Sequence, residues 1–483
     1  MKRIRIISII IAVITLLQSN VGFGQEVKRL SLDSSLVIAA KNNPQVKAAY
    51  TRYLAALEKV PQVGSLPDPE ASLGFFLKPM SLLGGDQVSD MRVMQMFPWF
   101  GTLKTARDEA SEMAKAKFEL FNAEKADLFF RVKAKWYQTE KISHEIALTE
   151  ENIHLLQSLE KIALIKFQEA ASSSGSMNNS GQMSSGSSAM GTMKTNSASS
   201  GGMSGMGGNA VQSKPMASSS SMSSGGSMGS SGTGMQDVLR VKMEILDQQN
   251  KLELLNDQLQ TAKTEFNALL NRDVHTVFTI ESNLESVKLP AEKAAIADSI
   301  LQNNPMLAML SSESSAYEAM GEKAKKMGLP MLGAGLDYML IQKREGNTSM
   351  MNGKDMVMPM VSVSIPIYRK KYDAMQKEAQ LMQESAQLES ESLKNDLQVQ
   401  YRNFVQSLDD AERRMKLNKE QEELARKTTD LLLTGFSNTG AGYEEVLRMQ
   451  YRVLDYGYKY IEAVTDYNTS VALAEKLMNA VKQ

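Results

Sequence analysis

The chain has 483 residues, a formal net charge of −1 at pH 7 and 42% hydrophobic residues. This composition allows a sizeable core, and it lacks the basic excess typical of proteins that bind nucleic acid. Cysteine is absent, which excludes disulfides, thiolate metal ligands, thiol catalysis and a lipid anchor on an N-terminal cysteine. No histidine pair has zinc-helix spacing, and no catalytic triad, phosphate loop or glycosidase carboxylate pair is apparent, so we do not expect an enzyme.

Residues 1–24 have the pattern of a secretory signal peptide. Three basic residues precede an apolar run over residues 6–17, and the small residues Gly22 and Gly24 follow it. An N-terminal membrane anchor is the alternative, but about a dozen apolar residues are few for a spanning helix. We therefore expect the mature chain to begin at Gln25.

The rest of the chain is predicted to consist of two repeats. Each contains, in order, a shorter helix, two strands, a very long helix, a tip and another shorter helix. Three landmarks recur at nearly constant separation, which indicates a duplication; they pair Asn42-Asn43-Pro44 with Asn303-Asn304-Pro305, Phe97-Pro98 with Ile365-Pro366, and Phe167 with Phe436. We assign residues 25–170 to the first repeat, 236–272 to its closing helix, 273–292 to a connector and 293–483 to the second repeat.

The helices are predicted to form a long antiparallel coiled coil. The first shorter helix is expected over about residues 32–60, and the long helices over about 103–168 and 372–436, each about 100 Å long at 1.5 Å per residue. Apolar residues in the closing helix alternate steps of three and four, as in a coiled-coil seam with one polar Gln: Val238, Val241, Ile245, Gln248, Leu252, Leu255, Leu259, Ala262, Phe266 and Leu269. An ordinary helical bundle is the alternative.

Period-two alternation predicts strands with one apolar face and one small or polar face. In residues 332–338 the apolar face carries Leu332, Ala334, Leu336 and Tyr338, and residues 71–77 repeat the pattern. In residues 356–365 a Val-rich face opposes Met356, Met358, Met360, Ser362 and Ser364. The alternation suits either a transmembrane β-barrel wall or a soluble sheet with one buried face. Four strands are too few to close a barrel in one chain.

Residues 171–235 form a low-complexity segment rich in Ser, Gly and Met. It contains almost no apolar residues that could be buried in a core. It separates Phe167 from Asp237 in the sequence, whereas the corresponding Phe436 and Glu445 are close to each other in the sequence. The segment is therefore predicted to be an insertion at a hairpin tip. Its methionines are Met177, Met183, Met190, Met193, Met203, Met206, Met216, Met222, Met228 and Met235.

The duplication, the long helices, the strand pairs and the tip with Phe436 and the run Glu445-Val446-Leu447 together resemble the TolC family of outer-membrane efflux proteins, over about residues 30–480 apart from the insertion. The resemblance implies a mainly α fold with a small β part, in which four transmembrane strands per chain form a 12-stranded barrel in a homotrimer, continued by a helical tunnel. It implies an outer-membrane duct of a Gram-negative cell, in contact with lipid and joined by a periplasmic adaptor to an inner-membrane pump, with RND the expected type.

Several residues take candidate roles from this resemblance. The adaptor-docking tip is assigned to Phe436, Asn438, Thr439 and Gly440, although the glycine stands one place later than in the family. The tunnel entrance is assigned to Asp237, Arg240, Glu445 and Arg448. Three copies of Glu445 and Arg448 are hypothesised to form an intersubunit ion-pair ring that holds the entrance shut. Charges confined to a helix surface are the alternative.

The methionines suggest a cargo. Thioether sulfur is a soft ligand suited to Cu(I) and Ag(I), and some members of the family serve copper and silver efflux. The loop methionines are hypothesised to bind such ions transiently, and Met94, Met96, Met356, Met358 and Met360 are expected to face the lumen if the Val face meets lipid. Packing by the strand methionines and compositional drift in the loop are the alternatives. Drug efflux, type I secretion and a secreted coiled-coil structural protein also stay open, and no resident cofactor is expected.

Overall fold

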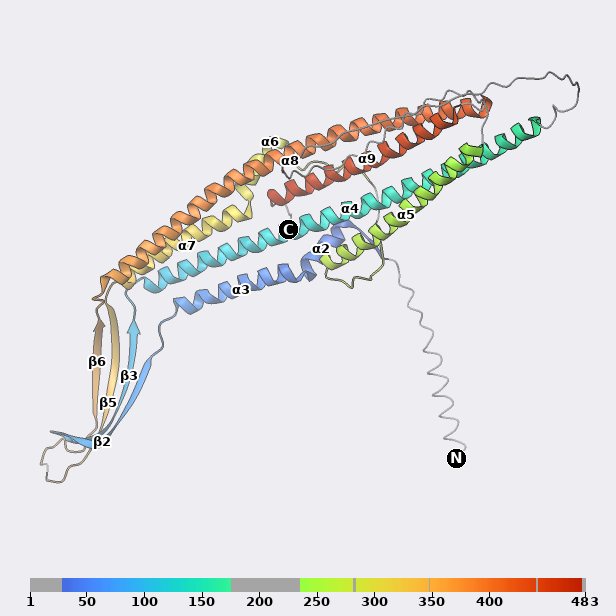
Figure 1. Cartoon of the computed structure of the whole chain (residues 1–483). Helices are drawn as coiled ribbons and strands as arrows, with labels where there is room; N and C mark the ends of the chain where they lie inside the picture. The colour runs from blue at the N-terminus through green and yellow to red at the C-terminus, as the bar shows by residue number, and fades with distance from the viewer. Residues whose placement is uncertain (1–27, 175–234, 281–283, 347, 440–441, 480–483) are drawn as a thin grey trace, which may run out of the picture. The chain divides into compact units, whose positions relative to one another are not determined.

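The computed structural model describes residues 28–174, 235–280, 284–346, 348–439 and 442–479. This part of the chain is mainly helical with a small β part, as predicted for the fold class (Figure 1). Its strands form a sheet of four and a sheet of two. Among these residues no helix combines the length and apolarity needed to span a membrane. The predicted signal peptide lies outside the described residues.

The first shorter helix of each repeat is interrupted at an asparagine. Helix α2 (Leu32–Asn42) ends before Asn43, whose side chain accepts a hydrogen bond of 2.9 Å from the backbone N–H of Gln45 at the start of α3 (Pro44–Gly64). Helices α6 (Lys293–Asn303) and α7 (Pro305–Met327) meet in the same way at Asn304. An Asn cap followed by Pro at the first helical position starts a new helix, so the continuous helix expected over residues 32–60 is two helices.

The two very long helices are present and each is followed by a helix of half its length. Helix α4 (Thr102–Ser174) has 73 residues and α8 (Arg369–Thr439) has 71, while α5 (Met235–Leu269) and α9 (Tyr443–Leu477) have 35 each. Residues 171–174 and Met235 belong to these helices, although the sequence pattern had placed them in the insertion.

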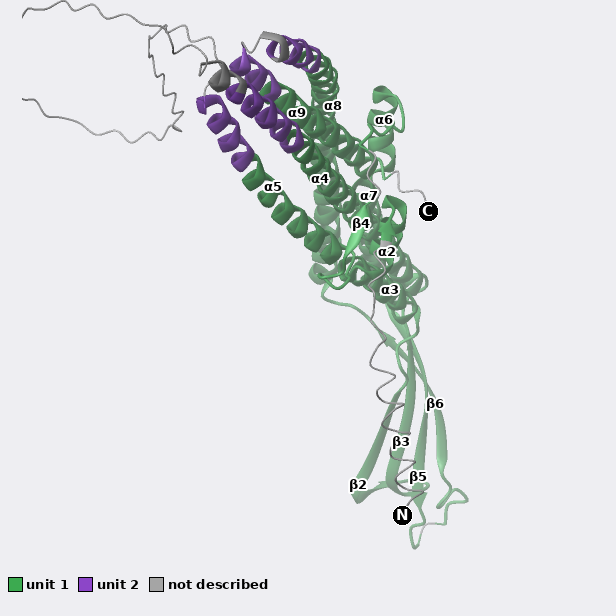
Figure 2. Ribbon diagram, turned by 90° about the vertical axis from the view of Figure 1, so that its right-hand side faces the viewer, with its two compact units in different colours: residues 1–152, 248–425, 451–483 green, residues 153–247, 426–450 purple. Residues whose placement is uncertain are grey.

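The chain divides into two compact units, shown in green and purple in Figure 2. Unit 1 comprises residues 1–152, 248–425 and 451–483, and unit 2 comprises residues 153–247 and 426–450. The predicted seam of α5 packs against α4 within each unit. In unit 1 Leu255 and Ala262 cluster with Ile142, and in unit 2 Val238 and Val241 cluster with Leu156 and Leu159.

A small parallel pair of strands was not predicted. Strand β1 (Lys28–Leu30) pairs with β4 (Phe278–Ile280), and Leu30 and Phe278 are buried in a core cluster of unit 1 with Trp136 and Phe266. These strands have three residues each, too few for a periodic pattern to identify them from the sequence.

The larger sheet belongs entirely to unit 1 and has the order β2-β3-β5-β6, with every neighbouring pair antiparallel. Its strands are β2 (Glu70–Leu82), β3 (Gly85–Phe97), β5 (Met331–Gln342) and β6 (Met356–Ser364). Each repeat therefore contributes one hairpin, and β3 and β5 join the two hairpins. Within the described residues, the outer edges of β2 and β6 have no partner strand.

Candidate functional site

One face of the four-stranded sheet is apolar and uncovered. Its side chains are at least 38% exposed, and Val361 is 82% exposed. They come from all four strands: Leu73, Phe75, Met91, Val93, Phe97, Leu332, Leu336, Tyr338, Val357, Val361 and Val363. Contiguous apolar surface of this kind marks contact with a membrane or another protein. The described residues of the chain do not cover this face.

The register places the predicted strand methionines together on the opposite face. Met94 pairs with Gly335, which pairs with Met360 on the far side, and in the next row Met96 pairs with Gly333, which pairs with Ser362. Because side chains alternate between the two faces of a sheet, residues in these rows share one face. Met356 and Met358 lie on the same face of β6 as Met360. We call this surface the methionine face: Met94, Met96, Gly333, Gly335, Met356, Met358, Met360 and Ser362.

Side-chain contacts define two features of the methionine face. The Ser362 hydroxyl lies 3.5 Å from the sulfur of Met94 and 3.8 Å from that of Met96. In the row beside Met94, Arg92 pairs with Asp337 at 3.1 Å, and the Asp337 side chain is only 1% exposed. The Arg92–Asp337 pair joins residues 245 apart in sequence, so sequence reasoning without the strand register did not find it.

The predicted docking residue Phe436 is a core residue of unit 2. Its side chain is fully buried, its ring centroid lies 5.2 Å from that of Tyr443, and Lys166 Nζ lies 5.6 Å from the ring centroid. Burial, with the negative charges of Asp237 and Glu160, raises the pKa of Tyr443 well above its usual value, so its phenol is neutral at physiological pH. Phe436 and Tyr443 therefore join the end of α8 to the start of α9.

The other docking residues are placed only in part. Asn438 and Thr439 belong to the last turn of α8 but their side chains lie outside the description, as does Gly440. The loop methionines from Met177 to Met228 also lie outside the described residues, whereas Met235 is 48% exposed at the start of α5. The docking and loop assignments stay predictions.

Three of the predicted entrance charges, Arg240, Glu445 and Arg448, form ion pairs within the chain. Arg448 Nη2 lies 3.0 Å from Glu445 Oε2 one turn earlier in α9, and Arg240 Nη1 on α5 lies 3.9 Å from Glu444 Oε2. All four side chains are more than 40% exposed, so these pairs contribute little stability. Sequence reasoning did not single out Glu444. The proposed ring joins different chains, and it stays a prediction.

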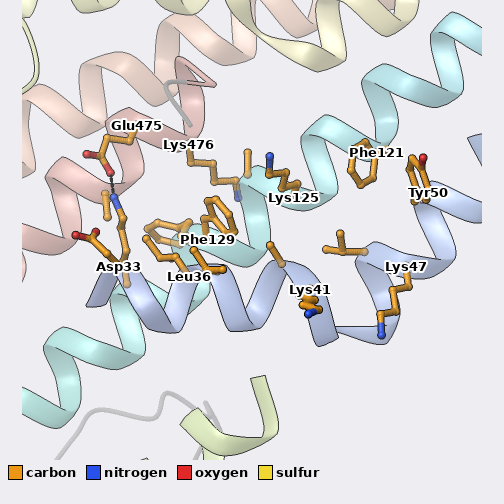
Figure 3. Close-up of a pocket in the computed structure, with 17 residues that line it drawn as sticks. Asp33, Leu36, Lys41, Lys47, Tyr50, Phe121, Lys125, Phe129, Glu475 and Lys476 are labelled. Atoms are coloured by element: carbon orange, nitrogen blue, oxygen red, sulfur yellow. Dashed lines mark hydrogen bonds and ion pairs between the residues drawn. The ribbon is translucent and has the colours of Figure 1, made fainter. Parts of the chain in front are cut away.

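Unit 1 also contains a pocket that no sequence motif indicated. Its volume is about 820 Å³, and α2, α3, α4 and α9 line it (Figure 3). The lining combines apolar side chains such as Leu36 and Phe129 with several lysines, and Lys133 forms an ion pair with Glu475. No group of three or more His, Asp or Glu side chains in the described ranges is arranged to hold a metal ion. The pocket therefore has no constellation that indicates catalysis.

Comparison with known proteins supports the fold. No protein-family model and no curated protein sequence matches the chain. Among solved structures, a membrane protein from Pseudomonas aeruginosa is similar with a TM-score of 0.66 at 13% identity, covering 95% of each chain. The CmeC outer membrane channel of Campylobacter jejuni has a TM-score of 0.64 at 10% identity, covering 93% of this chain and 85% of CmeC.

A third structure, that of CusC, described for its folding and transmembrane channel formation, has a TM-score of 0.63 at 13% identity and covers 95% of this chain and 94% of CusC. Identities this low establish the fold and not the cargo. The mainly α fold with a small β part that the resemblance implies is confirmed, and it is the fold of these solved structures; the 12-stranded trimeric barrel stays a prediction.

Proposed function

We propose that the chain is the outer-membrane exit duct of a tripartite efflux system and conducts its cargo passively. The observation that carries this proposal is the uncovered apolar face of the four-stranded sheet, opposed by a face with Arg92, Asp337 and methionines. A strand with one face toward lipid and the other toward a lumen needs this alternation. The fold shared with outer-membrane channels supports the same reading.

The functional form is a homotrimer. The unpaired edges of β2 and β6 would expose backbone N–H and C=O groups to hydrocarbon, where each unsatisfied group costs several kcal/mol. Pairing β6 of one copy with β2 of the next removes every edge, and three copies give 12 strands, enough to enclose a channel. The helices continue the duct into the periplasm, and the tips formed by α4–α5 and α8–α9 meet the periplasmic adaptor of an inner-membrane pump of RND type.

Cross-linking tests the closed ring of strands. Because the chain has no cysteine, a pair introduced as Ser72→Cys on β2 and Ser362→Cys on β6 provides the only thiols. The expected result is covalent oligomers that stop at three chains, with neighbouring β2 and β6 positions scanned to find the register. Ser72→Cys alone is the matched control and should stay monomeric under denaturing conditions, because β2 does not meet β2. Cross-linking that never exceeds the single-variant background would contradict the ring.

The proposed cargo is monovalent copper or silver. The chain has 33 methionines and no cysteine, and thioethers are soft ligands that favour these ions. The methionine face would present such ligands along the duct, and the loop methionines would collect ions at its periplasmic entrance. Drugs and secreted proteins are the competing cargoes, for which the methionines would serve only in packing.

Removal of the loop tests this cargo. Cu(I) binding by the purified protein and copper and silver tolerance of cells are measured for the full chain and for a variant that lacks residues 171–231. Both properties should fall in the variant while the trimer and pore persist. Unchanged binding and tolerance would make the loop a spacer and favour a duct for other cargo.

A further inference from the structure

We infer that Met94, Met96 and Met360 form a binding site for one soft monovalent ion, Cu(I) or Ag(I), on the methionine face. The inference rests on the proposed function, because it requires this face to line the duct. It deepens that function by assigning a defined site within the sheet, apart from the loop.

The sulfur atoms of two of these residues converge on one point. Met94 and Met96 stand two residues apart on β3, and both sulfurs lie within 3.8 Å of the hydroxyl oxygen of Ser362, which is two strands away on β6. To reach it, both side chains extend across β5 instead of standing upright from the sheet. Both residues are half-buried, so each is packed on one side while part of its surface stays accessible to solvent.

Glycines on β5 make this convergence possible. Gly333 lies between Met96 and Ser362, and Gly335 lies between Met94 and Met360. A Cβ at Gly333 would come within 2.2 Å of the Ser362 hydroxyl and 2.7 Å of the Met96 sulfur. The space that a side chain would fill is therefore occupied by the thioether of Met96. Met360, also half-buried, pairs with Gly335 from the side opposite Met94, so a third methionine stands on this face beside the same glycine.

The thioether ligands of the three methionines determine which ion the site prefers. Neutral thioethers bind soft monovalent ions such as Cu(I) and Ag(I), whereas Zn²⁺ prefers imidazole, thiolate or carboxylate ligands. Of the carboxylates on this face, Asp337 is 1% exposed and paired with Arg92, whereas Glu70 on β2 stands opposite Met94 on the side away from Ser362. A site of weak, neutral ligands can release its ion, as a conduit requires.

Silver block of the pore tests the site in the full chain. Wild-type protein in planar bilayers, with nitrate salts to avoid silver chloride, is titrated with Ag(I) and separately with Zn(II). The test variant is Met94→Leu/Met96→Leu, since leucine replaces methionine at nearly equal volume. The matched control is Met91→Leu, on the opposite face of the same strand and 48% exposed.

The wild type and the control should be blocked by Ag(I) but not by Zn(II). The double variant should need at least about tenfold more Ag(I) for the same fractional block of its own conductance, equivalent to ~1.4 kcal/mol of binding. Equal block in the double variant and the wild type would overturn the inference, because silver would then act elsewhere. Absence of conductance in every protein would instead contradict the proposed duct.

A second measurement detects silver binding at the site independently of conductance. The ¹³C-methyl resonances of methionine are followed in the detergent-solubilised full chain during an Ag(I) titration, with Met94 and Met96 assigned from the leucine variants. These two resonances should shift together and saturate, while that of Met91 stays unchanged. Unmoved Met94 and Met96 resonances at silver concentrations that shift the loop methionines would refute the site.

Discussion

Substitution of Val361 by arginine separates a lipid-facing sheet from a soluble one. Val361 lies on the apolar face of β6 and is 82% exposed, so it loses almost no packing within its own chain when it is replaced. In water, Val361→Arg should therefore change the free energy of unfolding by no more than ~0.5 kcal/mol, as at other surface sites. On the lipid face of a barrel, the same arginine costs about 2–4 kcal/mol near the bilayer midplane.

The assay is urea unfolding of the trimer in lipid vesicles, followed by the fluorescence of Trp99 and Trp136, the two tryptophans of the chain. The matched control is Met358→Arg, three residues earlier on β6 and on the methionine face, where its side chain is 39% exposed. The control should lose less than about 1 kcal/mol, because substitutions toward the lumen leave the lipid contact intact.

A loss of about 2–4 kcal/mol for Val361→Arg, with the control near the wild type, is the expected outcome. Equal stability of all three proteins would refute the assignment of this face to lipid. A greater loss for the control than for Val361→Arg would mean that the two faces have been assigned the wrong way round.

Four further predictions test other parts of the structure. Gly335→Ala should lower stability by about 1–3 kcal/mol, because its Cβ would lie 2.7 Å from a backbone carbonyl oxygen of β3; chemical denaturation measures the loss. Phe436→Ala should cost about 3–5 kcal/mol in unit 2 and expose the tip to limited proteolysis, and an unchanged cleavage pattern would contradict its core role. Arg448→Ala should leave the free energy of unfolding within about 0.5 kcal/mol of the wild type, because the ion pair of Arg448 with Glu445 in α9 is exposed. A rise in single-channel conductance in this variant would support the intersubunit ring, and unchanged conductance would count against it. Burial lowers the pKa of His144 below its usual 6.5, so the folded state favours the neutral imidazole. The stability that this contributes is complete above about pH 6.5 and is lost as the pH falls through the lowered pKa. His144→Gln should therefore make thermal stability less sensitive to acid below about pH 6.5, and an identical pH profile would contradict this.

Periodic patterns accounted for most of what the sequence predicted correctly. The seam of α5 follows from steps of three and four, and the shared face of the strand methionines follows from alternation, since each pattern depends only on the local geometry of one element. The exposure of the opposite face could not be predicted, because alternation is the same whether that face meets lipid or a core.

Features that depend on pairing between distant residues were missed. The Arg92–Asp337 pair and the contacts of Ser362 with two sulfurs require the register between β3, β5 and β6, which no single strand contains. The helix break at Asn43 is different. Its signal, an Asn cap followed by Pro, was present in the sequence and repeated at Asn304, and it should have divided the helix.

The central claim is that copies of this chain enclose a pore, and single-channel conductance in a planar bilayer tests it most directly. The purified full-length protein, confirmed as a trimer by its mass in detergent, is added to one side of the membrane. A pore-forming trimer should give discrete and reproducible current steps, which Val361→Arg makes rarer by impairing insertion while Met358→Arg does not. A trimer that inserts stably yet gives no current steps would contradict the duct and favour a structural coiled-coil protein.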